Sequence, residues 1–104
     1  METTTLLQQI KELVCTIEPT AHIFLYGSRA RNDARPDSDW DLLILVDGVV
    51  NPFRRDSIRH QIYEIEWEIG EVICSIIRSR QEWNTPHFQQ TPLSQSIAKE
   101  SILL

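Results

Sequence analysis

The sequence predicts one α/β (α+β) domain over residues 1–104, with a small mixed sheet of about three strands and flanking helices. Two observations predict this fold class. Some segments repeat apolar residues at three- and four-residue steps, which is the period of an amphipathic helix. Between them lie short apolar runs, rich in β-branched and aromatic residues, that adjoin a turn containing glycine and are typical of strands.

Three segments carry the helical period together with a start or stop signal. They are residues 5–18, which Pro19 ends, residues 54–69, which Gly70 ends, and residues 91–104, which open with the capping pair Thr91-Pro92. Their apolar residues gather near one face, so we expect each helix to pack that face on the sheet.

Three apolar runs lie between these helices and are expected to form the sheet. They are residues 22–26, 40–46 and 71–77. The second run is apolar throughout after Asp41, which predicts that both of its faces are buried. Residues 27–38 are polar and suit a short helical turn followed by a loop.

Charge and hydropathy narrow the classes of function. The formal net charge is −5, which argues against the binding of long nucleic acid. No apolar run approaches the ~20 residues needed to cross a bilayer, and the N-terminus lacks the pattern of a secretory signal, so we expect a cytoplasmic protein. Cys15 and Cys74 lie in apolar stretches without metal-ligand spacing, and we expect both thiols to be buried.

The informative stretch begins directly after the first strand. Gly27 lets the backbone turn sharply, and the first amides of the turn that Ser28 opens could face a phosphate. Asp39 and Asp41 alternate at the start of the second strand, so both carboxylates should lie on one face within reach of one divalent cation. Taken alone, Gly-Ser is usually a plain turn and Asp-x-Asp is usually a solvated strand start. Trp40 should point to the opposite face and join the core.

Together these residues resemble a known signature. Gly27-Ser28, ten intervening residues and Asp39-x-Asp41 before an apolar strand are similar to the motif of the DNA polymerase β-type nucleotidyltransferase superfamily. The Gly-Ser-Arg-Ala-Arg and Ser-Asp-Trp-Asp-Leu-Leu runs resemble its minimal nucleotidyltransferases, including the MntA-like antitoxins paired with HEPN-domain toxins. The resemblance implies the polymerase β-type fold, a nucleoside triphosphate substrate and Mg²⁺ as cofactor. It implies that Asp39 and Asp41 are catalytic residues that bind the metal, and that Gly27 and Ser28 bind the nucleotide.

The resemblance implies that three further charged residues belong to the site, and for each of them another role is left open. Arg29 and Arg31 would add positive charge at the triphosphate, although each could equally face solvent. Full activity in the superfamily usually needs a third carboxylate from the neighbouring strand, where this chain has no aspartate. Glu71, at the start of the third run, is the candidate catalytic acid, but it could instead lie at a helix end or a strand edge facing water.

The resemblance implies the transfer of a nucleoside monophosphate, AMP from ATP, to a protein hydroxyl of a HEPN-type toxin. The chain length leaves no room for a second substrate-holding domain, so we expect a partner to complete the site, and a homo-oligomer stays open. Trp67 and Trp83 are expected on the surface and could contact that partner. The alternative is a binding module with a weak or inactive site that neutralises a toxin by complex formation, which the missing third aspartate favours.

Overall fold

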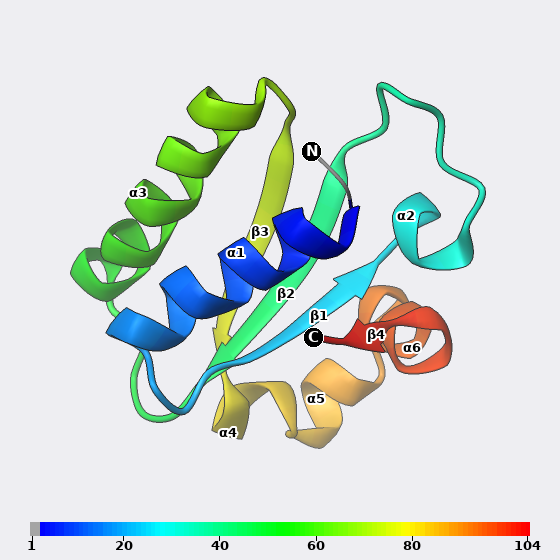
Figure 1. Cartoon of the computed structure of the whole chain (residues 1–104). Coiled ribbons are helices and arrows are strands. Elements are labelled where there is room, and N and C mark those ends of the chain that lie inside the picture. Colours follow the sequence, from blue (N-terminus) through cyan, green and yellow to red (C-terminus); the bar gives the residue numbers. More distant parts are fainter. Residues whose placement is uncertain (1–2) are drawn as a thin grey trace.

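The computed structural model describes residues 3–104 and arranges helices around one four-stranded sheet (Figure 1). In chain order the elements are α1 (Thr3–Ile17), β1 (His22–Tyr26), α2 (Ser28–Arg31), β2 (Trp40–Val46), α3 (Pro52–Ile69), β3 (Ile73–Ser79), α4 (Arg80–Trp83), α5 (Pro86–Gln89), α6 (Pro92–Glu100) and β4 (Ile102–Leu103). The strands lie in the order β3-β2-β1-β4, in which β2 and β3 are parallel and the other pairs are antiparallel. The expected α/β fold with a mixed sheet is confirmed, with one strand more than expected.

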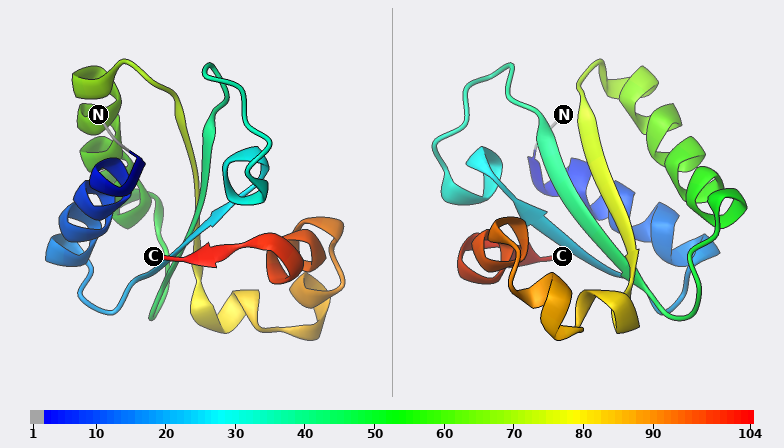
Figure 2. Two further views of the ribbon diagram at one scale, coloured as in Figure 1. Left: turned by 45° about the vertical axis from the view of Figure 1, so that its right-hand side comes forward. Right: turned by 180° about the vertical axis from the view of Figure 1, so that it is seen from behind.

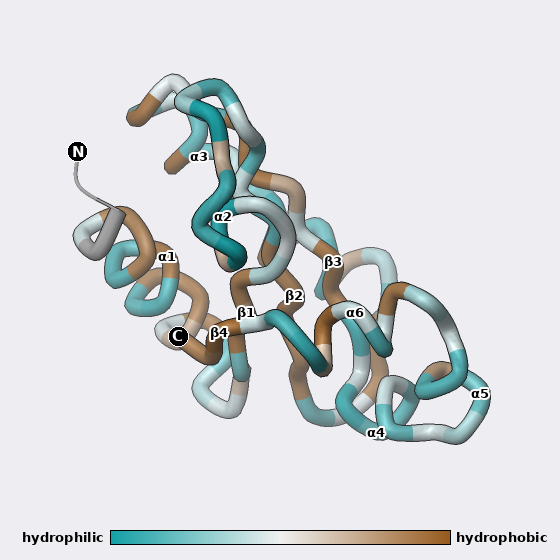
Figure 3. The backbone as a smooth tube through the Cα atoms, turned by 90° about the vertical axis from the view of Figure 1, so that its right-hand side faces the viewer, coloured by the Kyte–Doolittle hydropathy of each residue, from teal (hydrophilic) through white to brown (hydrophobic). Residues whose placement is uncertain are grey.

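Helices cover both faces of the sheet (Figure 2). Leu42 and Ile44 of β2 enter the larger core under α1 and α3, whereas Leu43 and Leu45 enter a smaller core with Trp83 and Ile97 from the α4 to α6 segment. Both faces of β2 are therefore buried, as its apolar run predicts. Figure 3 shows the hydrophobic colour along the strands and a largely hydrophilic segment between α2 and β2. Within residues 3–104, no helix combines the length and apolar character that crossing a bilayer requires.

The ends of α3 follow from its capping residues. The side chain of Asn51 accepts a hydrogen bond from the amide of Arg54 at 2.7 Å, and Pro52 occupies the first turn. Gly70 adopts left-handed angles, φ 70° and ψ 25°, and its amide donates to the carbonyl of Glu66 at 2.8 Å. The helix predicted over residues 54–69 is therefore confirmed, and it begins two residues earlier.

The C-terminal segment differs from the helix expected over residues 91–104. The helix ends at Glu100, because Ser101 has extended angles, φ −76° and ψ 154°. Ile102 and Leu103 then pair antiparallel with β1, and the amide of Leu104 donates to the carbonyl of Ile23 at 2.9 Å. The free edge of β1 offers backbone hydrogen-bonding groups that a longer helix would leave without partners, and this pairing adds the fourth strand.

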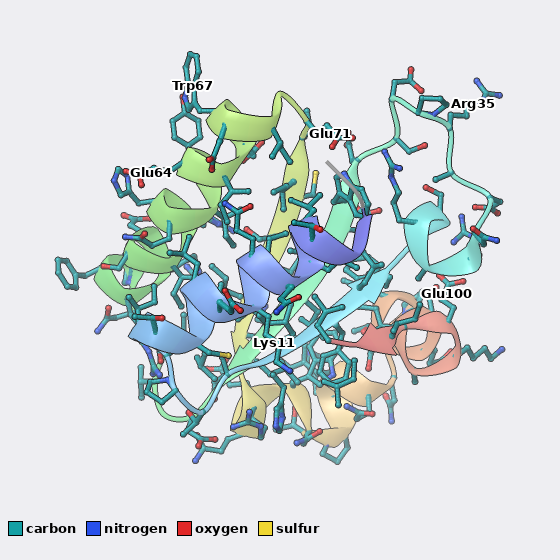
Figure 4. All side chains as sticks on the ribbon, in the orientation of Figure 1. Lys11, Arg35, Glu64, Trp67, Glu71 and Glu100 are labelled. Atoms are coloured by element: carbon teal, nitrogen blue, oxygen red, sulfur yellow. The ribbon has the colours of Figure 1, made fainter. Side chains whose placement is uncertain are left out.

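The two tryptophans expected on the surface have opposite environments. Trp67, near the end of α3, is 75% exposed and projects from the molecule in Figure 4, as expected. Trp83 is only 8% exposed and packs with Leu43 and Ile97 in the smaller core, so the expectation for Trp83 was wrong. The reason is that α4 to α6 fold back over the sheet and need a large side chain beneath them.

Candidate active site

Asp39 and Asp41, here called the carboxylate pair, come together on the face of the sheet that also carries α4 to α6. Asp41 is aligned with Tyr26 of β1 and with Cys74 of β3, and residues aligned across neighbouring strands point to the same face. Asp39 directly precedes β2, and its Oδ2 lies 3.6 Å from Sγ of Cys74. The alternation in the sequence therefore places both carboxylates beside a phenol and a thiol.

The turn after β1 brings backbone against the carboxylate pair. Gly27 has φ 76° and ψ −158°, a region that essentially only glycine adopts. A Cβ at this position would overlap Oδ2 of Asp41 and lie 3.3 Å from its Cγ. Ser28 follows as the first residue of α2, where the leading amides of a helix have no partner within it. The Gly27-Ser28 turn thus lies directly against Asp41 of the carboxylate pair.

Arg29 and Glu71 gather on the other side of β2, around Trp40. The Arg29 guanidinium stacks 4.2 Å above the centre of the Trp40 ring, and its Nη2 donates to the carbonyl of Ser38 at 2.9 Å. The same nitrogen lies 3.5 Å from Oε1 of Glu71, which Figure 4 shows just before β3. Because Trp40 alternates with the two aspartates, the structure does not bring Arg29 or Glu71 to the carboxylate pair. Their nucleotide-binding and catalytic roles stay predictions.

Arg31 is the arginine that remains on the side of the carboxylate pair. Its side chain is 45% exposed and forms ion pairs with Asp33 at 3.2 Å and with Glu100 of α6 at 3.1 Å (Figure 4 labels Glu100). Its positive charge partly opposes the rise in the pKa of Asp41. Surface ion pairs of this kind contribute little stability, so Arg31 can exchange them for a bound anion.

The site holds more negative than positive charge. Partial burial, and then the charge of Asp39, raise the pKa of the Asp41 carboxyl above its ordinary value. Burial, and then the charge of Asp41, likewise raise the pKa of the Tyr26 phenol. Both shifts have the sign that neighbouring negative charge and desolvation produce, and a divalent cation would relieve both.

Cys74 is the site residue that the sequence analysis misses. Both thiols were expected to be buried, and this was wrong, because Cys15 is half-buried and Cys74 is exposed. The third strand begins at Ile73 instead of residue 71, which leaves Glu71 before the strand and aligns Cys74 with Asp41. Alternation along the strand could have indicated the face of Cys74, but the register with β2 is set by tertiary pairing and not by local sequence.

The donor atoms fit a divalent cation in part. Carboxylate oxygens suit Mg²⁺, and the absence of a side chain at Gly27 leaves room beside Asp41. Among residues 3–104, no group of three or more His, Cys, Asp or Glu side chains is arranged to hold a metal. A cation bound by the carboxylate pair would therefore need further ligands from water or from phosphates, which is how Mg²⁺ is commonly held in phosphate-transfer sites.

A cavity elsewhere in the molecule does not coincide with this site. It has a volume of about 400 Å³ and lies between α3 and β3. Its lining residues are Arg59, His60, Ile62, Tyr63, Glu66, Ile73 and Ser75. None of these residues belongs to the predicted site, so the cavity is separate from the carboxylate pair and the Gly27-Ser28 turn.

The class of the protein follows from a family comparison that agrees with this geometry. Residues 7–104 match the family described as the nucleotidyltransferase domain, and the chain belongs to that family. No curated protein sequence matches the chain.

Solved structures share the fold at low sequence identity. A toxin–antitoxin complex with AMP-PNP has a TM-score of 0.65 and 14% identity, covering 92% of this chain and 69% of that chain. Spectinomycin adenyltransferase AAD(9) from Enterococcus faecialis, solved with ATP and spectinomycin, has a TM-score of 0.66 and 20% identity, covering 80% and 36%. A candidate minimal nucleotidyltransferase has a TM-score of 0.62 and 23% identity, covering 100% and 97%. At these identities the likeness shows the fold alone.

Proposed function

We propose that the chain is a Mg²⁺-dependent nucleotidyltransferase that transfers AMP from ATP to a hydroxyl of a partner protein, and that it acts as the antitoxin of a HEPN-type toxin. The observation that carries the proposal is the carboxylate pair beside the Gly27-Ser28 turn, in a chain of the nucleotidyltransferase family. The similar structures with AMP-PNP and with ATP support an adenine nucleotide. The similar toxin–antitoxin complex supports a protein partner.

Different residues of this chain would bind the metal ion and the phosphates of the nucleotide. Asp39 and Asp41 would hold Mg²⁺, which would neutralise charge on the triphosphate and on the departing pyrophosphate. The Ser28 hydroxyl and the amides of Ser28 and Arg29, at the start of α2, would donate hydrogen bonds to the β- and γ-phosphate oxygens. Gly27 keeps that backbone close to Asp41, so phosphates bound there would lie beside the carboxylates. Arg31 adds positive charge from the exposed side.

An exposed apolar patch supports a protein acceptor. Tyr63, Trp67 and Val72, here called the α3 patch, are 54%, 75% and 53% exposed. The rings of Tyr63 and Trp67 meet edge to face, with centroids 6.2 Å apart. Exposed aromatic and aliphatic side chains gathered in this way are typical of protein interaction sites. The net charge of −5 would also steer association with a basic, RNA-binding toxin.

Intact-mass spectrometry of the partner tests the transfer. Incubation of a purified HEPN-type toxin with ATP, Mg²⁺ and this protein should add one or more AMP units to the toxin. Asp39→Asn should slow the addition by about 10²-fold or more, because an electrostatic contact made in the transition state is lost. Asp37→Asn is the matched control, since it removes an exposed loop carboxylate just before the pair and should leave the rate unchanged.

A second candidate function is a binding module that neutralises the toxin without chemistry. The observation in its favour is that, within residues 3–104, no third carboxylate joins the carboxylate pair, and Glu71 is paired with Arg29 on the Trp40 side. A stable complex that inhibits the toxin, with no mass gain and no ATP binding, would select this function. Substitutions in the α3 patch would then weaken inhibition, whereas Asp39→Asn would not.

A further inference from the structure

Cys74 faces the carboxylate pair from the neighbouring strand. The parallel register aligns Cys74 with Asp41, and its Sγ lies 3.6 Å from Oδ2 of Asp39. Ile73 and Ser75, on either side of it, point to the opposite face of the sheet because side chains alternate along a strand. Position 74 is therefore the place on β3 from which a side chain can reach both aspartates.

Two glutamates beside β3 are held by other partners. Glu71 forms its ion pair with Arg29, and Oε2 of Glu66 accepts a hydrogen bond from the amide of Ile73 at 3.2 Å. The thiol at position 74 is a poor ligand for Mg²⁺, which takes oxygen donors. The carboxylate pair thus faces a position that offers no oxygen.

We propose that residue 74 sets how strongly cation binding depends on the nucleotide. With cysteine at this position, the carboxylate pair and water bind a divalent cation weakly, and the phosphates of the nucleotide strengthen binding by supplying charged oxygen ligands. An aspartate at this position would place a third carboxylate beside Asp39 and Asp41 and would let the cation bind first. The inference rests on the proposed function, because it concerns the same metal and nucleotide site.

Electron paramagnetic resonance of free Mn²⁺ measures cation binding without any turnover. In the absence of nucleotide, Cys74→Asp should bind Mn²⁺ at least about tenfold more tightly than the wild type, because it adds a charged oxygen ligand. ATP should then increase the Mn²⁺ affinity of the wild type more than that of the variant. Ser75→Asp is the matched control, since it adds the same charge on the opposite face and should leave the affinity unchanged.

Thermal unfolding gives a second readout. In EDTA, Cys74→Asp should melt at a lower temperature than the wild type, because three carboxylates repel one another, and Mn²⁺ should reverse this loss. Cys74→Ala removes the sulfur without adding charge, so its Mn²⁺ affinity should equal that of the wild type. This variant keeps the inference testable even where Cys74→Asp folds poorly without a cation.

The outcomes separate the inference from the proposed function. Wild-type protein that binds Mn²⁺ with ATP, together with a folded Cys74→Asp variant whose nucleotide-free affinity is unchanged, would overturn the inference alone. A loss of Mn²⁺ affinity in Cys74→Ala would overturn it as well, because the sulfur would then be a ligand. Wild-type protein that binds neither Mn²⁺ nor ATP would contradict the proposed function, and the inference with it.

Discussion

At the start of β2, the charged side chains on the two sides of the strand have different surroundings. On one side, Arg29 lies over Trp40 and is paired with Glu71 and with backbone carbonyls. On the other side, Asp41 is half-buried beside Asp39, and its pKa is raised. The first arrangement pairs opposite charges, whereas the second leaves negative charge that a cation would neutralise. Because side chains alternate along a strand, the consecutive residues Trp40 and Asp41 belong to different environments. Trp40 lies with the Arg29–Glu71 ion pair, and Asp41 lies in the candidate active site.

Among the substitutions proposed here, Gly27→Ala should disrupt the carboxylate pair and the adjoining turn most strongly. The added Cβ would overlap the Asp41 carboxylate, and the backbone angles of Gly27 cost about 1–3 kcal/mol for any other residue. We expect the free energy of unfolding, measured with urea, to fall by an amount of that order. The affinity for Mg²⁺-ATP should fall by a larger fraction of its wild-type value than the free energy of unfolding does. Unchanged ATP affinity in the folded variant would contradict the close approach of turn and carboxylate.

Gly70→Ala is the control for this prediction. Gly70 also has a positive φ of 70°, but a Cβ there would meet nothing within 4 Å. The variant should therefore lose about 1–2 kcal/mol of stability from backbone strain alone. Its affinity for Mg²⁺-ATP should match that of the wild type, because Gly70 lies at the end of α3 and not beside Asp41.

The two arginines should separate stability from nucleotide binding. Arg29→Ala removes charged hydrogen bonds and the contact with Trp40, and it should lower the free energy of unfolding by about 1.5–3 kcal/mol. Arg31→Ala removes only exposed ion pairs, so stability should hardly change while the affinity for Mg²⁺-ATP falls. Urea denaturation and calorimetry on both variants check this pattern. An Arg29→Ala variant with full stability and weakened ATP binding would instead place Arg29 at the nucleotide.

The smallest expected effect concerns pH. Burial and Asp39 raise the pKa of Asp41 in the folded protein, so folding favours its protonated form. The stability linked to Asp41 is therefore fully present below its unfolded pKa, and it is lost as the pH rises through the higher folded pKa. Asp41→Asn should melt above the wild type at neutral pH in EDTA, by a margin that shrinks in acid. Scanning calorimetry that finds the variant less stable at neutral pH would contradict this account.

Local sequence predicts the elements that carry the site. The strands over residues 22–26 and 40–46 have the expected bounds. Short apolar runs that end at a glycine turn are typical of buried strands in a small domain. The grouping of Gly27 with Asp41 also follows the motif. Alternation correctly placed Trp40 opposite the two aspartates.

Features set by tertiary pairing could not be predicted in the same way. The fourth strand depends on Ile102 and Leu103 finding the edge of β1, which no local pattern reveals. The register of β3 decides that Cys74, and not Glu71, faces the carboxylate pair. Trp83 looked like a surface residue because the segments that cover it are short and polar.

Calorimetric titration with ATP tests the central claim most directly. The account predicts that ATP binds to the wild type in the presence of Mg²⁺ and much more weakly in EDTA. The double variant Asp39→Asn with Asp41→Asn should show no binding while still unfolding cooperatively, whereas Glu71→Gln, on the Trp40 side, should retain binding. Unchanged Mg²⁺-dependent ATP binding in the double variant would contradict the assignment of the carboxylate pair as the metal and nucleotide site.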